Sequence, residues 1–167
     1  MQLLISDSNI LIDLIVVGHI ETMFRLPYTF AVPDILYEEE LKIHHSELLS
    51  YGLEIRSLSS ETMAYALELS AKYTQPGTND LFALALAKEG SCPLLTGDAA
   101  LRQAAENEAV ILFGTIWIVE HMIRHHLITI EEGRELFISM REKKRRLPWD
   151  VAKVHLDQLE SEIKNEL

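Results

Sequence analysis

The sequence is short of cysteine and of long apolar runs. It contains one cysteine among 167 residues, Cys92, which excludes a framework of internal disulfides. Because Cys92 lies in an apolar stretch, we expect a buried, unreactive thiol and a reducing, cytoplasmic environment. The apolar run from Ile10 to Val17 is too short to span a bilayer, contains Asp13 and has no basic segment before it. We therefore expect neither a secretory signal nor a membrane protein.

Positive charge is also scarce. Fifteen Lys and Arg residues stand against 26 Asp and Glu, which gives a formal net charge of −11. This balance argues against a protein that coats nucleic acids in general. It leaves a nuclease open, because a bound metal and one local basic patch can offset the acidity at a site. The dense basic run from Arg141 to Arg146 either contacts RNA phosphates or is simply a solvated helix end.

Apolar residues are plentiful, at 48% of the chain, and they alternate between strand-like and helix-like segments. Strand-like runs are expected near residues 3–5, 30–32, 53–56, 93–96 and 110–113, with helices between them. This alternation predicts an α/β fold of three layers, with a central, mostly parallel sheet between two layers of helices.

The character of the chain changes after residue 126. Thr129 and Glu132 form a capping box for one helix, and Leu156, Leu159 and Ile163 make the apolar stripe of a last helix. We therefore predict a catalytic domain at residues 1–126 and a C-terminal helical appendage at residues 127–167.

Acidic residues mark the points where the apolar segments end. Asp7 directly follows the first strand, and Asp98 follows the strand that ends at Thr96. Because the carboxyl ends of parallel strands meet at one edge of a sheet, these two carboxylates should lie near each other. Asp80 belongs to the first turn of a helix that is otherwise apolar. Each aspartate could instead be an ordinary helix cap or first-turn residue.

The triplet Glu38-Glu39-Glu40 supplies a fourth acidic position. At about 100° per residue, the three glutamates cannot all face the same way. If Ile35, Leu36 and Ile43 define the inward face of their helix, Glu39 is closest to its centre. Glu40 is the second choice, and a fully solvated triplet is the alternative. Carboxylates that converge in this way repel one another unless a hard cation such as Mg²⁺ or Mn²⁺ binds among them.

Several other polar residues are weaker candidates. Asn9, Thr78 and Thr96 stand beside the acids and could hold them through hydrogen bonds. His121 and His125 have the i, i+4 spacing of a zinc pair, but the rest of a zinc-binding motif is missing. Asn9 also argues against an aspartate-nucleophile phosphatase, which would need a second aspartate at this position.

Four segments of the sequence resemble the acidic motifs of the PIN domain family, in the same order. They are Ser6 to Asp13, Val32 to Leu41, Thr78 to Ala87 and Leu94 to Arg102, and Gly114 to Trp117 is similar to the segment that follows the last core strand of such proteins. The resemblance covers roughly residues 1–126. Its acidic positions fall on Asp7, Glu39, Asp80 and Asp98, and Glu40 is the other register for the second motif.

The resemblance implies an endoribonuclease that depends on Mg²⁺ or Mn²⁺ held by these four carboxylates. It also implies a cytoplasmic homodimer, an RNA substrate and an antitoxin protein as partner, as in VapC-like toxins. Two other functions stay open at this point. One is a non-catalytic interaction module with the same fold, and the other is a nuclease of RNA processing or of DNA.

Overall fold

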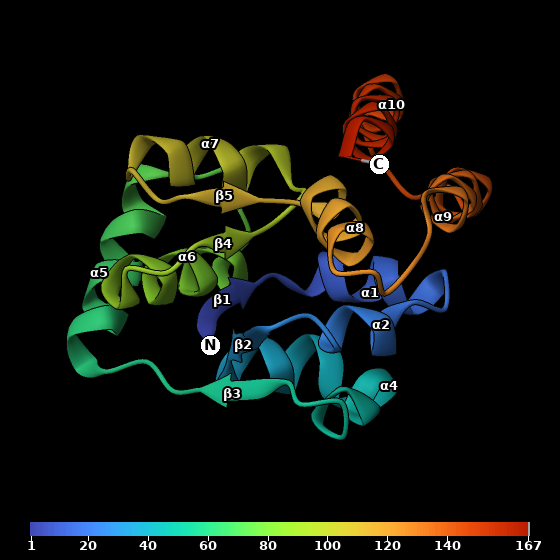
Figure 1. Ribbon diagram of the computed structural model, residues 1–167. Helices are drawn as coiled ribbons and strands as arrows, with labels where there is room; N and C mark the ends of the chain where they lie inside the picture. Colours follow the sequence, from blue (N-terminus) through green and yellow to red (C-terminus); the bar gives the residue numbers. More distant parts are fainter. Residues whose placement is uncertain (167) are drawn as a thin grey trace.

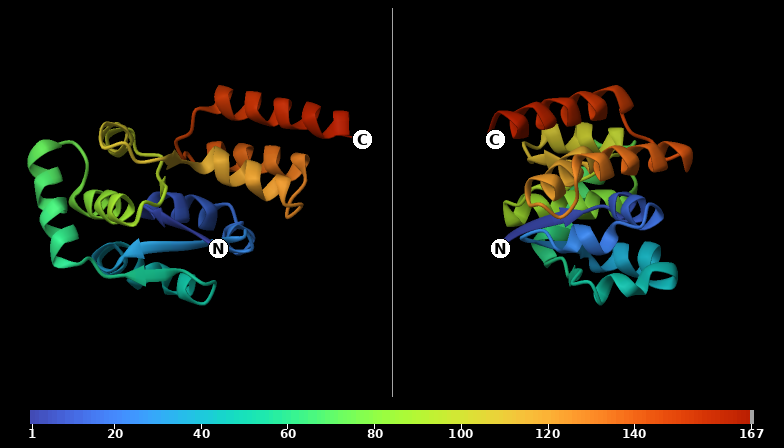
Figure 2. Two further views of the ribbon diagram at one scale, coloured as in Figure 1. Left: turned by 60° about the vertical axis from the view of Figure 1, so that its left-hand side comes forward. Right: turned by 45° about the vertical axis from the view of Figure 1, so that its right-hand side comes forward.

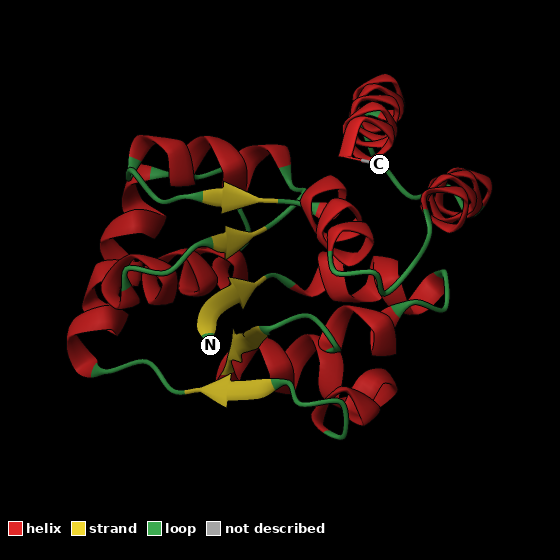
Figure 3. Cartoon of the chain, in the orientation of Figure 1, coloured by secondary structure: helices red, strands yellow, loops and turns green. Residues whose placement is uncertain are grey.

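Five parallel strands form the centre of the fold, and helices lie on both of their faces (Figures 1 and 3). The computed structural model describes residues 1–166. Every strand pairing in this range is parallel, and the order across the sheet is β3-β2-β1-β4-β5. The strands are β1 (Gln2–Ser6), β2 (Tyr28–Pro33), β3 (Glu54–Arg56), β4 (Leu94–Leu95) and β5 (Leu112–Phe113). The predicted α/β fold with a parallel sheet is confirmed.

Helices make up most of the connections between the strands. The α-helices of the domain body are α1 (Ser8–Val16), α2 (Ile20–Phe24), α3 (Asp34–Leu36), α4 (Lys42–His45), α5 (Ser60–Lys72), α6 (Thr78–Gly90), α7 (Ala99–Asn107) and α8 (Thr115–Arg124). A π-helical turn, η1 (Tyr37–Leu41), joins α3 to α4, and a 3₁₀ turn, η2 (Ser46–Leu49), follows α4. None of the helices in residues 1–166 is both long and apolar enough to cross a membrane.

Alternate side chains of the central strands β1, β2 and β4 enter different hydrophobic cores. Leu4, Phe30 and Leu95 belong to the core beneath α1, α2 and α8, whereas their neighbours in sequence, Ile5 and Ala31, belong to the core beneath α6 and α7. This is the period of two that a strand imposes on its side chains. Because both faces are covered, the central strands are continuously apolar, as expected for a buried parallel sheet.

The order of the strands reverses direction between β1 and β4. The chain proceeds from β1 outward through β2 to β3, and it later returns to the other side of β1 to add β4 and β5. In open α/β sheets, the crevice at such a switch point is the usual place for a ligand. The residues that directly follow β1 and β4 therefore lie where a site is expected.

The segment between β2 and β3 differs from the single helix that the sequence suggests. It divides into α3, η1, α4 and η2, and the π-helical turn shifts the helical phase of all residues after it. Leu36 and Tyr37 face the core as the turn begins, and the turn brings Leu41 into the core as well, whereas Ile43 is 82% exposed. The expectation that Ile43 lies on the inward face is wrong.

Two further helices, α9 (Ile130–Glu142) and α10 (Trp149–Glu166), follow α8 and lie beside it (Figure 2). The predicted capping box of Thr129 and Glu132 is present at the start of α9. Side chains of both helices, among them Leu136 and Leu156, enter the same hydrophobic core as α1 and α8. The division at residue 126 into a catalytic domain and an appendage stays a prediction.

The single cysteine is less buried than its apolar surroundings suggest. Cys92 is a free, half-buried thiol that follows the end of α6, and its side chain donates to the carbonyl oxygen of Gly90. Desolvation raises the pKa of this thiol, which opposes formation of the reactive thiolate.

Candidate active site at the carboxyl edge of the sheet

Asp7 is a fully buried carboxyl at the end of β1. It caps the N-terminus of α1, where its Oδ1 accepts a hydrogen bond from the backbone N–H of Ile10 at 3.0 Å. Its Oδ2 accepts from the Thr96 hydroxyl at 2.5 Å. Burial raises the pKa of Asp7 to about 7, although both hydrogen bonds lower it, and the nearby Asp80 and Asp13 raise it further. Asp7 is therefore a helix N-cap, as one interpretation of the sequence predicted. Unlike the N-cap of a solvated helix, however, its carboxyl is removed from water.

Thr96 connects Asp7 to Asp98. Its hydroxyl oxygen, which donates to Asp7, also accepts a hydrogen bond from the backbone N–H of Asp98 at 3.0 Å. Asp98 in turn caps α7, where its Oδ1 accepts from the N–H of Leu101 at 2.8 Å. The two aspartates that follow neighbouring strands are therefore held by one buried threonine, as the sheet-edge argument requires.

Asp80 lies in the first turn of α6, directly before the buried stretch from Leu81 to Ala85. Desolvation raises the pKa of the Asp80 carboxyl to about 6, and the negative charges of Asp98 and Glu40 add to the shift. The turn before α6 leaves little room, since a Cβ at Gly77 would lie 3.3 Å from Asp80 Oδ2. Asp80 is thus a half-buried carboxyl among other acids, and it has no ion-pair partner within residues 1–166.

The glutamate triplet divides into three different environments. Glu38 is exposed and pairs with Lys42 at 3.0 Å, one helical turn away. Glu39 accepts from the Asn79 amide at 2.8 Å, and the same amide reaches Glu40 at 3.2 Å. Glu40 also accepts from the hydroxyl of Ser8, the residue after Asp7, at 3.0 Å.

These contacts bear on the choice between the two registers. The phase argument for Glu39 depended on Ile43 facing inward, and this is not so. Both Glu39 and Glu40 line a cavity of about 400 Å³ together with Asp80. Of the two, only Glu40 accepts a hydrogen bond from Ser8, the neighbour of Asp7. The charge of Glu40 also raises the pKa of Asp80. The geometry therefore favours Glu40, and Glu39 stays a candidate.

The acids are neighbours without forming a closed cage. Within residues 1–166, no three His, Cys, Asp or Glu side chains lie close enough together to surround one ion. Asp7, Asp80, Asp98 and Glu40 instead form a chain of adjacent carboxyls, linked by shared hydrogen bonds and mutual repulsion. Their donor atoms are all oxygens, which suits Mg²⁺ or Mn²⁺. A divalent cation bound among these oxygens would lower the raised pKa values of Asp7 and Asp80.

The two histidines with zinc-like spacing do not belong to this site. The rings of His121 and His125 lie on α8, with centroids 6.2 Å apart, and His121 lies against Trp117 at 4.0 Å. No group of metal-binding side chains in the described chain includes them.

Three contributors to the site were missed from the sequence. Ser8 and Asn79 hold the glutamates, and each directly adjoins an aspartate that the sequence did single out. Asp13 is the third, a buried residue of α1 whose carboxylate accepts a hydrogen bond from Arg145 Nε in the segment between α9 and α10. A buried aspartate in an apolar helix needs a cationic partner, but the sequence does not reveal which cation that is.

Comparison with known proteins agrees with the fold. The family model DUF3368, described as a PIN domain, matches residues 3–161, which include α9 and most of α10. The chain belongs to the PIN domain family. Members of the PIN domain family are in general nucleases. A search of curated proteins finds no match.

Two solved structures share the PIN fold at low sequence identity. A PilT N-terminus domain protein from the hyperthermophilic archaeon Sulfolobus solfataricus P2 is 16% identical, with a TM-score of 0.51 over 75% of this chain and 97% of that one. A chain of VapBC2 from Rickettsia felis, bound to a DNA fragment from their promoter, is 19% identical. Its TM-score is 0.50 over 68% of this chain and 98% of that one. At these identities the likeness establishes the fold alone.

Proposed function

We propose that this PIN domain protein is an endoribonuclease that hydrolyses RNA phosphodiester bonds with a divalent metal, Mg²⁺ or Mn²⁺. The observation that carries the proposal is the buried carboxyl of Asp7, whose pKa is raised to about 7 and which lies in a row of acids that have no ion-pair partner within residues 1–166. Burial of a carboxyl costs free energy unless a cation or hydrogen bonds compensate it. A metal among these oxygens would remove that cost.

The proposed metal-binding residues are Asp7, Asp80, Asp98 and a glutamate, for which we propose Glu40 with Glu39 as the alternative. Thr96 fixes the orientation of the Asp7 carboxylate and, through its second hydrogen bond, the position of Asp98. When bound, a divalent ion lowers the pKa of a coordinated water and neutralises charge on the phosphate and the leaving oxygen. No serine or cysteine nucleophile is needed for this reaction.

To bind a metal, the carboxylates of the site must also be ionised. Each oxygen of Asp7 already accepts one hydrogen bond, and a carboxylate oxygen has a second lone pair for another partner. Ser8 and Asn79 hold the glutamates at the mouth of the cavity in the same way. The chain thus presents preorganised oxygen ligands on rigid strand ends and helix starts.

We propose further that the protein is a VapC-like toxin with an antitoxin protein as partner, acting as a homodimer in the cytoplasm. Support comes from the motif order in the sequence and from the likeness to a chain of VapBC2. The alternatives are a nuclease of RNA processing and one that acts on DNA.

A cleavage assay tests the central part of the proposal. Labelled single-stranded and structured RNAs are incubated with the wild type, Asp7→Asn and Asp157→Asn, in Mg²⁺, Mn²⁺ or EDTA. Asp157 is an exposed aspartate of α10 that pairs with Arg134, so its substitution is a matched control away from the site. We expect cleavage by the wild type and Asp157→Asn only, and only with metal. Equal cleavage by Asp7→Asn, or cleavage in EDTA, would refute the proposal.

A further inference from the structure

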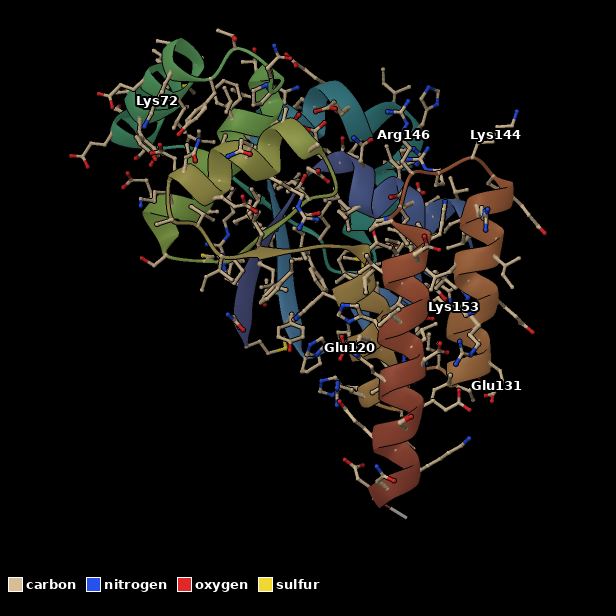
Figure 4. All side chains as sticks on the ribbon, turned by 90° about the horizontal axis from the view of Figure 1, so that it is seen from above. Lys72, Glu120, Glu131, Lys144, Arg146 and Lys153 are labelled. Carbon is tan, nitrogen blue, oxygen red and sulfur yellow. The ribbon has the colours of Figure 1, made fainter. Side chains whose placement is uncertain are left out.

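The segment that joins α9 to α10, residues 143–148, is fastened to the domain body beside the carboxylate site. Arg145 is its anchor, because the guanidinium pairs with the buried Asp13 of α1. Asp13 and Arg145 line the same cavity as Asp98, so the anchor brings this segment next to the carboxylate site. Figure 4 shows the labelled Lys144 and Arg146 along this segment, between the ends of α9 and α10.

The two cations on either side of Arg145 are not used in this anchor. Lys144 and Arg146 are exposed, and within residues 1–166 neither forms an ion pair. Both line a cavity of about 510 Å³, which is also lined by Asn9, Asp13 and Asp98. The cavity thus has a basic wall from the α9–α10 segment and an acidic wall from the candidate active site.

A second cavity, of about 420 Å³, adjoins the first and brings in another cation. Arg146 lines both cavities, and in the second it is joined by Arg102 of α7, which lies about one helical turn after Asp98. Arg102 is also exposed and without an ion pair in the described chain. Arginines from two separate elements therefore line one depression next to Asp98.

We infer that Arg102, Lys144 and Arg146 form a phosphate-binding wall that holds a nucleic-acid backbone against the carboxylate site. In a chain with a net charge of −11, a polyanion can approach only where cations are concentrated and free of acidic partners. A purely structural basic segment would pair its cations with acids, as Arg145 does. The location of this wall rests on the proposed function, but its binding property does not require cleavage.

The test measures binding of the full-length protein to labelled oligonucleotides in EDTA, where no metal-dependent cleavage occurs. The variant is Arg102→Gln/Arg146→Gln. The matched control is Arg25→Gln/Lys164→Gln, which removes the same charge. Arg25 follows α2 on the chain leading to the amino end of β2, and Lys164 lies in the last turn of α10. For single strands, each lost phosphate contact lowers the slope of log Kd against the logarithm of the salt concentration by about 0.7. Loss of two contacts should lower the slope by about 1.4 and weaken binding about 25-fold at 0.1 M salt.

The outcomes separate this inference from the proposed function. Weaker binding of RNA, single-stranded DNA or both, with recovery in Arg102→Lys/Arg146→Lys, supports the wall, and the comparison shows which backbone it accepts. Binding by Arg102→Gln/Arg146→Gln with the slope and affinity of the control would overturn it. A wild type that binds but never cleaves would refute the nuclease and keep the wall, whereas cleavage by the wild type with unchanged binding in the variant would refute only the wall. Thermal unfolding of each variant confirms that it is folded.

Discussion

Asp7→Asn should stabilise the metal-free protein at alkaline pH. The pKa of Asp7 is raised from 3.8 to about 7 because the carboxyl is buried. A group with a raised pKa binds its proton more tightly in the folded state than in the unfolded state. For this acid the contribution to stability is therefore full below pH 3.8 and is lost as the pH rises through about 7.

The size of the effect follows from the shift. One pKa unit corresponds to about 1.4 kcal/mol, so ionisation of Asp7 costs the folded state up to about 4 kcal/mol at pH 8. Asparagine has the same shape and cannot ionise, so it avoids this cost. In Asp7→Asn the amide makes a weaker hydrogen bond with Thr96 than the carboxyl does. This change lowers the stability of the folded variant by about 1 kcal/mol at every pH.

Urea denaturation in EDTA at pH 4 and pH 8 measures the effect. Asp7→Asn should be slightly less stable than the wild type at pH 4 and about 3 kcal/mol more stable at pH 8. Adding Mg²⁺ at pH 8 should stabilise the wild type and leave the variant unchanged, since the ion binds the folded carboxylates. A stability difference that is the same at both pH values would refute the claim that Asp7 is a costly buried acid.

Three other predictions concern separate parts of the molecule. Glu40→Gln should lower RNA cleavage by roughly tenfold to 100-fold, and Glu38→Gln should leave it unchanged; equal effects would show that the triplet has no preferred member. Glu108 has its pKa lowered to about 2 by hydrogen bonds from Tyr65 and two further side chains. Its stabilising effect should therefore be present above pH 4.5 and lost as the pH falls to about 2, and Glu108→Gln should abolish that part of the acid transition in circular dichroism. Arg145→Gln leaves a buried aspartate without its cation and should cost about 1–3 kcal/mol in urea denaturation, a partly exposed pair being weaker than a fully buried one. An unchanged midpoint would show that this pair is not an anchor.

The three aspartates could be predicted because each depends on local rules. Asp7 and Asp98 follow apolar strands, and parallel strands that neighbour each other end at the same edge. Asp80 stands out because a continuous apolar and buried stretch, Leu81 to Ala85, follows it directly in its helix. The alternation of strands and helices likewise determines the layers of the fold, since the central strands β1, β2 and β4 have apolar residues on both faces of the sheet.

The remaining features depend on contacts between distant parts of the chain. The choice between Glu39 and Glu40 is set by a π-helical turn, and such a turn has no signature in the spacing of apolar residues. Arg145 meets Asp13 across 132 positions of sequence. Neither residue type nor spacing indicates that pairing. From the sequence, the basic run therefore had two possible roles, as an RNA contact or as a solvated helix end.

Binding of Mn²⁺ tests the carboxylate site most directly. Electron paramagnetic resonance follows free Mn²⁺ as it is titrated into the wild type, Asp7→Asn and the control Asp157→Asn at pH 8. We predict that the wild type and the control bind Mn²⁺ with equal affinity and that Asp7→Asn binds at least tenfold more weakly, because a neutral amide replaces a metal-binding carboxylate. Equal binding by all three proteins would contradict the assignment of the metal site to these acids.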